Sequence, residues 1–429
     1  MRAVAAIRAK TSSLAGLWDQ PNFRRFWAAD LVSKVGDSTT LLVLPLIAIV
    51  VLGSTPHEVG LIGAAQLGPA ILLGLPAGVW VDRLGHRRSI MIAADLGRCV
   101  SLSSIPVAYV LGGLSIGQLY AVAAINATLA AFFDVASSAL VPSLVGRPNL
   151  VEANAKLALG RSAAEVSGPA IGGSLIGLVG APLAILFDGA SFLASAIQLR
   201  HIDLAEPDDP RHRPATNASL RADVLVGVRY VAHQPYVRAI VATAFIANFS
   251  RTICLTVLLI YAIRVVGLSA AEVGLAFAIG NVGFFVGALT ATKLTRRMSI
   301  GRAMLASVLC FGPGMTLAAV APAPILLAAI AGMAFLNTFG VATHGVNQIS
   351  LRQSVTPPEL LARVSAVTRL VIMGALPLGA TVGGALGSFI GLRETLVAGT
   401  VGLYVAAAPY LLSRIHRLRW LPEPDRLTG

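Results

Sequence analysis

The chain has 429 residues, of which 56% are hydrophobic and only 12% are charged, and its formal net charge is +13 at pH 7. A soluble globular protein has about 25% charged residues, so this composition excludes a soluble enzyme or binding domain and indicates a helical membrane protein. The positive charge does not indicate nucleic-acid binding, because the sequence has no basic face with interleaved aromatic residues.

A membrane-spanning helix needs roughly 20 mostly apolar residues. Runs of this kind recur along the whole chain, and they predict an all-α membrane protein with twelve spans. The predicted spans lie near residues 24–52, 58–81, 89–111, 116–140, 158–179, 182–202, 237–263, 271–292, 303–321, 324–349, 366–390 and 395–413.

The basic residues predict the orientation. If both termini are cytoplasmic, the outer loops hold only Arg264 and Arg393, and three further basic residues (Lys34, Arg98 and Arg251) lie inside spans. The other 28 of the 33 Lys and Arg residues are then cytoplasmic, as the positive-inside rule requires. We therefore predict a multi-pass protein of the bacterial inner membrane with both termini in the cytoplasm.

The spans fall into two related sets. The polar residues 203–234 separate them, beginning as a flexible linker and ending in an amphipathic helix from Ser219 onward. Residues 58–60 and 272–274 both read EVG, and Gln-Pro occurs at residues 20–21 and 234–235, each pair at an offset of 214. The sequence thus predicts two six-helix pseudo-repeats, residues 1–202 and 235–429, joined by a cytoplasmic linker, an arrangement common in secondary transporters.

Charged residues inside the spans are candidates for ion coupling, because intramembrane acids usually mark ion or substrate paths. Asp30, Lys34 and Asp37 share one face of the first span, and Asp30 and Lys34 are expected to pair. Asp37 lies about 20 Å along this helix at 1.5 Å per residue. It is the first candidate proton carrier, and Asp134 in span four is the second.

Arg251 in span seven is the repeat counterpart of Asp37, so an interaction of the two is expected. Asp134 is also placed to contact Arg98. Two further pairs with helical spacing are interpreted as structural, and their members are Asp95 with Arg98 and Arg161 with Glu165.

Two motifs indicate a family. The loop between spans two and three reads GVWVDRLGHRRS, and it resembles the G-x-x-x-D-R-x-G-R-R/K loop of the major facilitator superfamily, with His86 where Arg is usual. This resemblance implies the twelve-helix fold of that family. It also implies an inner-gate role for Asp82, and the gating residues are then Gly78, Asp82, Arg83, Gly85, Arg87 and Arg88.

The second motif, SGPAIGG in span five, resembles the antiporter motif of exporters in the same family, with Ala164 in place of its first glycine. Proline removes a helical hydrogen bond, and glycines give a smooth helix face. The motif residues are Gly168, Pro169, Gly172 and Gly173. Span four lacks the Arg found in many proton-coupled exporters of the family. Further stretches, among them SKVGDS and SVTPPELLARVSAVTRL, are typical of bacterial macrolide and siderophore exporters.

These observations predict a secondary active transporter that expels a small amphiphilic compound in exchange for protons by alternating access. An importer on the same fold is the alternative, and a membrane-embedded enzyme or receptor is a third possibility that the lack of a catalytic constellation disfavours. No Walker loop or metal-ligand spacing occurs, so no cofactor or metal is expected. The predicted partners are substrate, protons and the lipid bilayer, the protein is expected to be monomeric, and candidate cavity residues are Asn126, Asn248, Asn281, Asn337 and His344.

Overall fold

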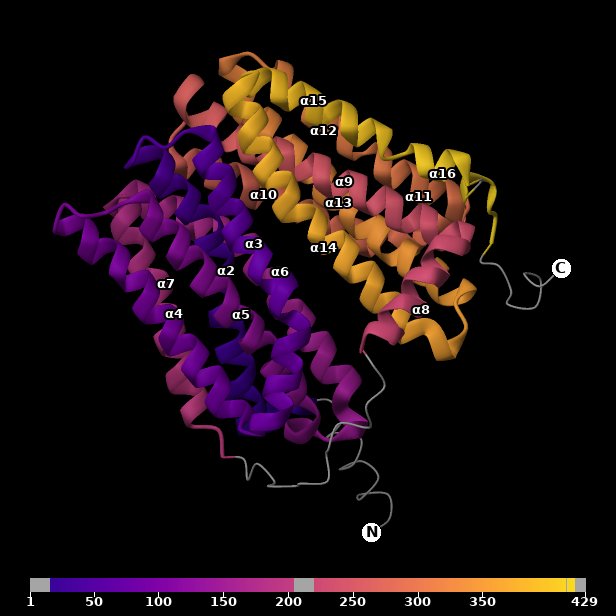
Figure 1. Ribbon diagram of the computed structural model, residues 1–429, viewed down its shortest axis with the longest axis horizontal. Coiled ribbons are helices and arrows are strands. Elements are labelled where there is room, and N and C mark those ends of the chain that lie inside the picture. The colour runs from indigo at the N-terminus through magenta and orange to yellow at the C-terminus, as the bar shows by residue number, and fades with distance from the viewer. Residues whose placement is uncertain (1–15, 204–219, 414, 421–429) are drawn as a thin grey trace, which may run out of the picture.

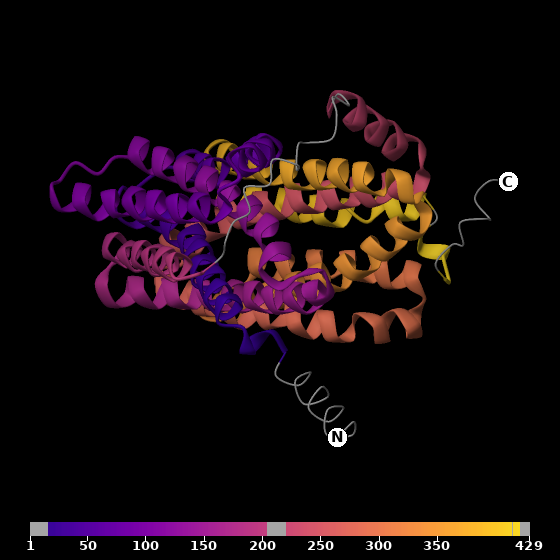
Figure 2. The same cartoon turned by 90° about the horizontal axis from the view of Figure 1, so that it is seen from below.

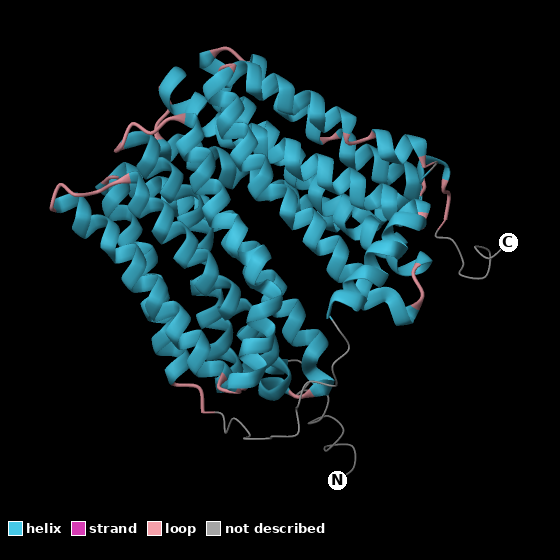
Figure 3. Ribbon diagram, in the orientation of Figure 1, coloured by secondary structure: helices cyan, strands magenta, loops and turns pink. Residues whose placement is uncertain are grey.

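The computed structural model describes residues 16–203, 220–413 and 415–420. Within these ranges every regular element is a helix, which confirms the predicted all-α class (Figure 3). A few side chains inside the described ranges are themselves outside the description; they belong to Leu75, Asp82, Arg147, residues 220–223 and Ala323.

The first group of long helices follows the first six predicted spans. A short 3-10 helix, η1 (Gly16–Asp19), precedes it. The long helices are α2 (Pro21–Val50), α3 (Pro56–Leu84), α4 (Arg87–Val110), α5 (Ile116–Val145), α6 (Leu150–Val179) and α7 (Ala181–Arg200), with the 3-10 turn η2 (Arg147–Asn149) before α6.

The second group follows the other six. α8 (Leu220–His233) is the predicted linker helix, and it packs against α14 and α9 at the margin of the molecule (Figure 2). The long segments are α9 (Pro235–Ile260) with the π-helical turn η3 (Tyr261–Val265), α10 (Ala270–Met298), α11 (Ile300–Leu309) with α12 (Phe311–Val320), α13 (Ala323–Val355), α14 (Pro358–Phe389), and α15 (Leu392–Val405) with α16 (Ala408–Leu412), followed by η4 (Ile415–Arg417).

Ten of these twelve segments are long and apolar enough to cross a membrane. α6, with 30 residues, lies outside that set, and α3, with 29, is interrupted by Leu75 and Asp82, whose side chains are outside the description. In α6 the reason is its composition, because Lys156, Arg161 and Glu165 interrupt the apolar run.

Each group packs on itself, and the two groups meet along two helix pairs (Figure 1). In the first half α2 contacts α5, α6 and α7, and in the second half α9 contacts α14 and α15. Between the halves α3 packs on α14 and α6 packs on α10.

The turns show the same repeat as the sequence. α3 and α10 both begin with a capping box, in which the side chain of Thr55 or Ser269 accepts from the backbone of Glu58 or Glu272 and the glutamate bonds back to the capping residue. These pairs are 214 residues apart, the offset found in the sequence. Local chemistry therefore builds equivalent helix starts in the two halves.

The halves touch closely at one end of the bundle. We name this the far end; it holds the loops before α3, α10 and α15, and the opposite end, which carries Arg87, is the basic end. A Cβ on Gly60 would lie 2.8 Å from the Cα of Gly384, and one on Gly173 would lie 2.9 Å from the Cα of Gly274. Only glycine allows these backbones to approach so closely. The two contacts are equivalent under the internal repeat.

Hydrogen bonds reinforce this closure. At the far end the His57 backbone N–H donates to Ser388 Oγ at 3.0 Å, and Arg264 donates to the Ile49 carbonyl oxygen at 2.9 Å. A third hydrogen bond between the halves, from Asn281 to the Glu165 carbonyl oxygen, lies at mid-depth. The helices diverge toward the basic end in Figure 1, so the conformation is closed at the far end.

Candidate functional site

The charged side chains of the first half meet in one network near the middle of its helices. α2 contributes Lys34 and Asp37, α4 contributes Asp95 and Arg98, and α5 contributes Asp134. Helical spacing places Lys34 and Asp37 on one face of α2, and it places Asp95 and Arg98 on one face of α4. These faces come together because α5 packs on both α2 and α4, and α7 packs on both of them as well.

Asp37 is the central acid of the network, because it binds both cations. Lys34 Nζ lies 3.2 Å from Asp37 Oδ2 and 2.5 Å from Asp134 Oδ1. Arg98 Nη1 lies 2.5 Å from Asp37 Oδ1, and its Nη2 lies 2.7 Å from Asp95 Oδ1. Three carboxylates thus share two cations, which leaves one negative charge in excess when all are ionised. Such a network can accept a proton without leaving a cation unpaired.

The network is buried on one side and open on the other. Arg98 and Asp95 are inaccessible to solvent, whereas the Asp134 side chain is 51% exposed. The Arg98 guanidinium lies over the rings of Phe133 and Phe192, with its Cζ 5.0 and 4.2 Å from their centroids. The buried cation therefore fixes the inner side of the network, and the acids nearer the surface can exchange protons with water.

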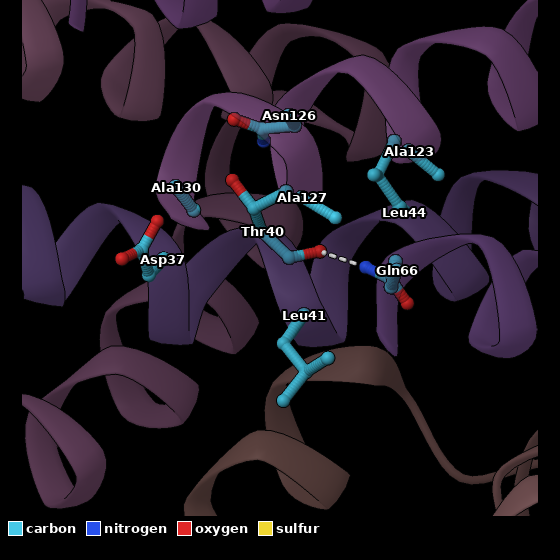
Figure 4. A pocket seen from close by; sticks show the side chains of 9 residues that line it. All are labelled: Asp37, Thr40, Leu41, Leu44, Gln66, Ala123, Asn126, Ala127 and Ala130. Atoms are coloured by element: carbon cyan, nitrogen blue, oxygen red, sulfur yellow. Dashed lines mark hydrogen bonds between the residues drawn. The ribbon is translucent and has the colours of Figure 1, made fainter. Parts of the chain in front are cut away.

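A cavity of about 190 Å³ lies beside Asp37 (Figure 4). It is open on one side and lined by α2, α3 and α5, and Gln66 Nε2 donates to the Thr40 carbonyl oxygen at 3.1 Å beside it. Its volume is large enough for several water molecules, each of which takes about 30 Å³ in the liquid. The lining residues are Asp37, Thr40, Leu41, Leu44, Gln66, Ala123, Asn126, Ala127 and Ala130.

Asp188 in α7 is a buried acid that sequence reasoning missed. It is inaccessible to solvent, its Oδ2 accepts from Thr40 Oγ1 at 2.7 Å, and its Oδ1 has no partner among the described residues. Because Thr40 also lines the cavity, Asp188 lies one side chain away from it. A single acid in the apolar run 182–202 was the available signal.

The predicted pairing of Asp37 with Arg251 is wrong in this conformation. Asp37 binds Lys34 and Arg98 inside its own half. Arg251 donates from Nη2 to Asn248 Oδ1 at 3.2 Å, and no described carboxylate is within ion-pair distance of it. Equivalent positions in a repeat need not meet, because each helix first packs with its own half.

Three other predicted pairings of charged residues also differ from the structure. Asp134 is paired with Lys34 and not with Arg98. Asp30 accepts a hydrogen bond from Ser137 at 3.4 Å and forms no ion pair with Lys34, whose amine reaches deeper acids instead.

Arg161 and Glu165, both exposed, form no ion pair in the described structure. Exposure explains this, since water competes for both charges. Asp95 and Arg98, by contrast, lie 2.7 Å apart in the interior.

The residues of the GVWVDRLGHRRS motif turn the chain from α3 into α4 at the basic end. Gly85 ends α3 with a φ of 68°, a left-handed conformation that favours glycine. Arg87 donates to the Ala139 carbonyl oxygen of α5 at 2.8 Å, and Arg88 donates to that of Ile202. Both arginines thus hold the turn to the first half. Arg83 is exposed, and the Asp82 side chain lies outside the described part of the chain.

Gly78, one of the gating residues that the family resemblance implies, makes no close helix contact in this conformation. A Cβ at Gly78 would have no atom within 4 Å. The close contacts of α3 lie instead near its other end, at Gly60, where the halves meet.

The SGPAIGG glycines pack against two different helices. A Cβ on Gly168 would lie 2.4 Å from Ser38 Cβ, and one on Gly172 would lie 3.0 Å from Thr39 Cγ2, both on α2. Gly173 contacts α10 of the other half, as described above. The motif therefore lets α6 fit between α2 and α10, and Pro169 lies between these contacts.

The candidate cavity residues do not form one group. Asn126 lines the cavity beside Asp37, and Asn281 donates to the Glu165 carbonyl oxygen across the two halves. Asn337 is buried, and its Nδ2 has no partner among the described residues. His344 is buried with its Nε2 2.6 Å from the hydroxyl of Tyr410, which joins α13 to α16.

Two six-helix groups, the first with a buried charge network among its helices, define a multi-pass membrane transporter. The family model of the Major Facilitator Superfamily matches residues 26–380, and the chain belongs to this superfamily of secondary transporters. The family and fold predicted from the two motifs are thereby confirmed.

Among characterised relatives, the multidrug efflux pump Tap of Mycolicibacterium fortuitum is 27% identical over 406 residues, covering 92% of this chain and 97% of that protein. The enterobactin exporter EntS of Escherichia coli O1:K1 is 26% identical over 430 residues, covering 97% of each. Among solved structures, the nucleoside transporter NupG (D323A mutant) matches with a TM-score of 0.73 at 13% identity, covering 91% of this chain and 99% of that one. A bacterial homologue of the lysosomal transporter Spinster, inward-facing and unoccupied, matches with a TM-score of 0.70 at 17% identity, covering 94% and 98%.

Proposed function

We propose that this protein is a proton-coupled exporter of a small amphiphilic compound in the bacterial cytoplasmic membrane. The observation that carries the proposal is the network in which Asp37, Asp95 and Asp134 share Lys34 and Arg98 beside a cavity. A transporter that uses protons needs acids that can change charge within the membrane, and this network supplies them.

Export is the direction that two further observations favour. The SGPAIGG motif is typical of exporters, and the two relatives named above are an efflux pump and an exporter. An importer on the same fold would also need a proton network, so the network alone does not distinguish the directions.

The proposed orientation places the basic end in the cytoplasm. The described loops and helix ends there carry Arg87, Arg88, Arg200, Arg296 and Arg297, and positive charge is retained on the cytoplasmic side. Both termini and the 203–234 linker are then cytoplasmic, and a far end that is closed corresponds to an inward-facing conformation.

In the proposed cycle the halves 1–202 and 235–429 rock about their shared helix pairs. Opening the far end separates Gly60 from Gly384 and Gly173 from Gly274. A proton that reaches Asp37 from outside neutralises it, weakens its bonds to Lys34 and Arg98, and so shifts the balance between the two conformations. Release of this proton inside restores the paired network, and Asp134 is the second acid placed to exchange it.

The experiment is transport into inside-out membrane vesicles. Candidate drugs, siderophores and other amphiphiles are added to the medium outside vesicles that contain the protein, with and without an imposed proton gradient. Substrate accumulation that requires an acidic interior supports proton-coupled export. Accumulation that ignores the gradient, or that runs with the proton, contradicts it.

A further inference from the structure

Arg251 is a cation at mid-depth in the second half. It lies about 24 Å along α9 from Pro235 at 1.5 Å per residue, and it is half-buried. Asn248 accepts from Arg251 Nη2 at 3.2 Å and uses one of the five guanidinium donors. As shown above, no described carboxylate pairs with it.

The second half has no acid that can replace that partner at this depth. Its acids in the described ranges are Glu272, Glu359 and Glu394, and each lies in the first turn of α10, α14 or α15, at an end of the bundle. The first half, by contrast, places Asp37 at the repeat-equivalent depth and surrounds it with cations. The two halves therefore differ in charge at this depth.

Arg251 also points away from the helices that pack most closely on α9. A Cβ on Gly379 of α14 would meet the Phe249 carbonyl oxygen, and one on Gly402 of α15 would meet Ser250 Oγ. At 100° per residue, Asn248 and Arg251 lie on the opposite side of α9. The remaining neighbours of α9 include α13 and, from the first half, α3.

An unpaired guanidinium is costly at this depth unless water or an anion reaches it. Its planar donors match two oxygens of a carboxylate, sulfonate or phosphate group. We infer that Arg251, oriented by Asn248, binds an anionic oxyacid group of the transported compound. The substrate class is then an amphiphile with an acidic group. The inference rests on the proposed transport function but concerns binding, which can be measured without transport.

The test is calorimetry on the purified full-length chain in detergent, with titrations into protein-free detergent subtracted. The probes share one ring system and differ in charge: 1-naphthalenesulfonate, 1-naphthalenesulfonamide and 1-naphthylmethylammonium. We expect the sulfonate to bind about tenfold tighter than the neutral sulfonamide, because a hydrogen bond to a charged group is worth more than a neutral one. The ammonium probe is expected to bind more weakly than either.

Arg251→Gln is expected to remove the preference for the sulfonate and to change sulfonamide affinity less than about twofold, while Arg251→Lys retains part of the preference. Lys293→Gln is the matched control, since it removes an exposed positive charge from the same half, and it is expected to retain the full preference. Equal affinity of the wild type for sulfonate and sulfonamide, no binding of either to folded protein, or an equal loss of both in Arg251→Gln would overturn the inference. A sulfonate preference in a protein that shows no proton-driven export in vesicles would refute the proposed function and leave the Arg251 site standing.

Discussion

The Asn281 side chain donates from Nδ2 to the main-chain carbonyl oxygen of Glu165 at 2.7 Å, from α10 in one half to α6 in the other. Glu165 precedes Pro169 by four residues, so its carbonyl has no helical N–H donor. Asn281 supplies the missing donor. The proline of the SGPAIGG motif thereby creates an acceptor inside α6, and the opposite half satisfies it in the conformation that is closed at the far end.

Asn281→Leu is expected to disfavour this conformation by about 1 kcal/mol, the net value of one hydrogen bond, or roughly a fivefold shift in population. Distances between spin labels on the two halves at the basic end measure the shift. The control is Pro169→Ala, which restores an N–H that can donate to Glu165. In that background Asn281→Leu should have much less effect. An equal effect in both backgrounds would show that Asn281 acts elsewhere.

Asp37→Asn fixes the central acid of the network in a neutral form of the same shape. If Asp37 carries the proton, uphill export driven by a pH gradient should be lost, while exchange of substrate for substrate survives because the halves can still rock. Both activities are measured in the same vesicles. Asp134→Asn is the companion variant. If Asp37→Asn still concentrates substrate against its gradient, Asp37 has a packing role and Asp134 becomes the first candidate.

Gly173→Val places a branched side chain where a Cβ already lies 2.9 Å from the Ala270 carbonyl oxygen and the Gly274 Cα. The far end should then fail to close, and the population should shift toward the conformation open at that end. Labelling of a single cysteine at Ala271 by an impermeant reagent measures this opening, because α6 packs against that half-buried position in the closed form, where a Cβ on Gly177 would lie 3.2 Å from Ala271 Cβ.

Gly78→Val is the matched control for Gly173→Val, since nothing lies within 4 Å of a Cβ added at Gly78 in this conformation. Gly78→Val should leave the labelling at Ala271 unchanged or reduced. Equal labelling of the two variants would mean that the glycine contact does not control closure.

The proposed orientation is tested with single cysteines at His57 and His233, which are both exposed. His57 lies at the far end and His233 ends the linker helix α8. An impermeant thiol reagent added to intact cells should label the cysteine at residue 57 and spare the one at residue 233 until the membrane is permeabilised. The reverse pattern would invert the orientation and, with it, the inward-facing assignment.

The sequence by itself determined the class, the helices and the repeat. Apolar runs of spanning length can satisfy their backbone hydrogen bonds in lipid only as helices, so hydropathy alone was enough to locate the twelve segments. Most helix ends lie within a few residues of the predicted ends, but α6 and α14 each begin eight residues before the predicted start. The capping boxes of Thr55 and Ser269 depend only on residues close in sequence, and their glutamates are the first residues of the two EVG triplets. The pair of Asp95 and Arg98 could also be anticipated, because both residues lie on one helix.

Only the tertiary structure decided which charges meet. The approach of α2, α4 and α5 determines that Lys34 reaches Asp134 and that Asp37 binds Arg98 and not Arg251. Asp188 and the donation of Asn281 to Glu165 also depend on contacts between helices that are distant in sequence. Spacing along one helix is set by its 3.6-residue period, whereas the neighbours of a helix face depend on how complete helices pack, and a linear pattern does not record that packing.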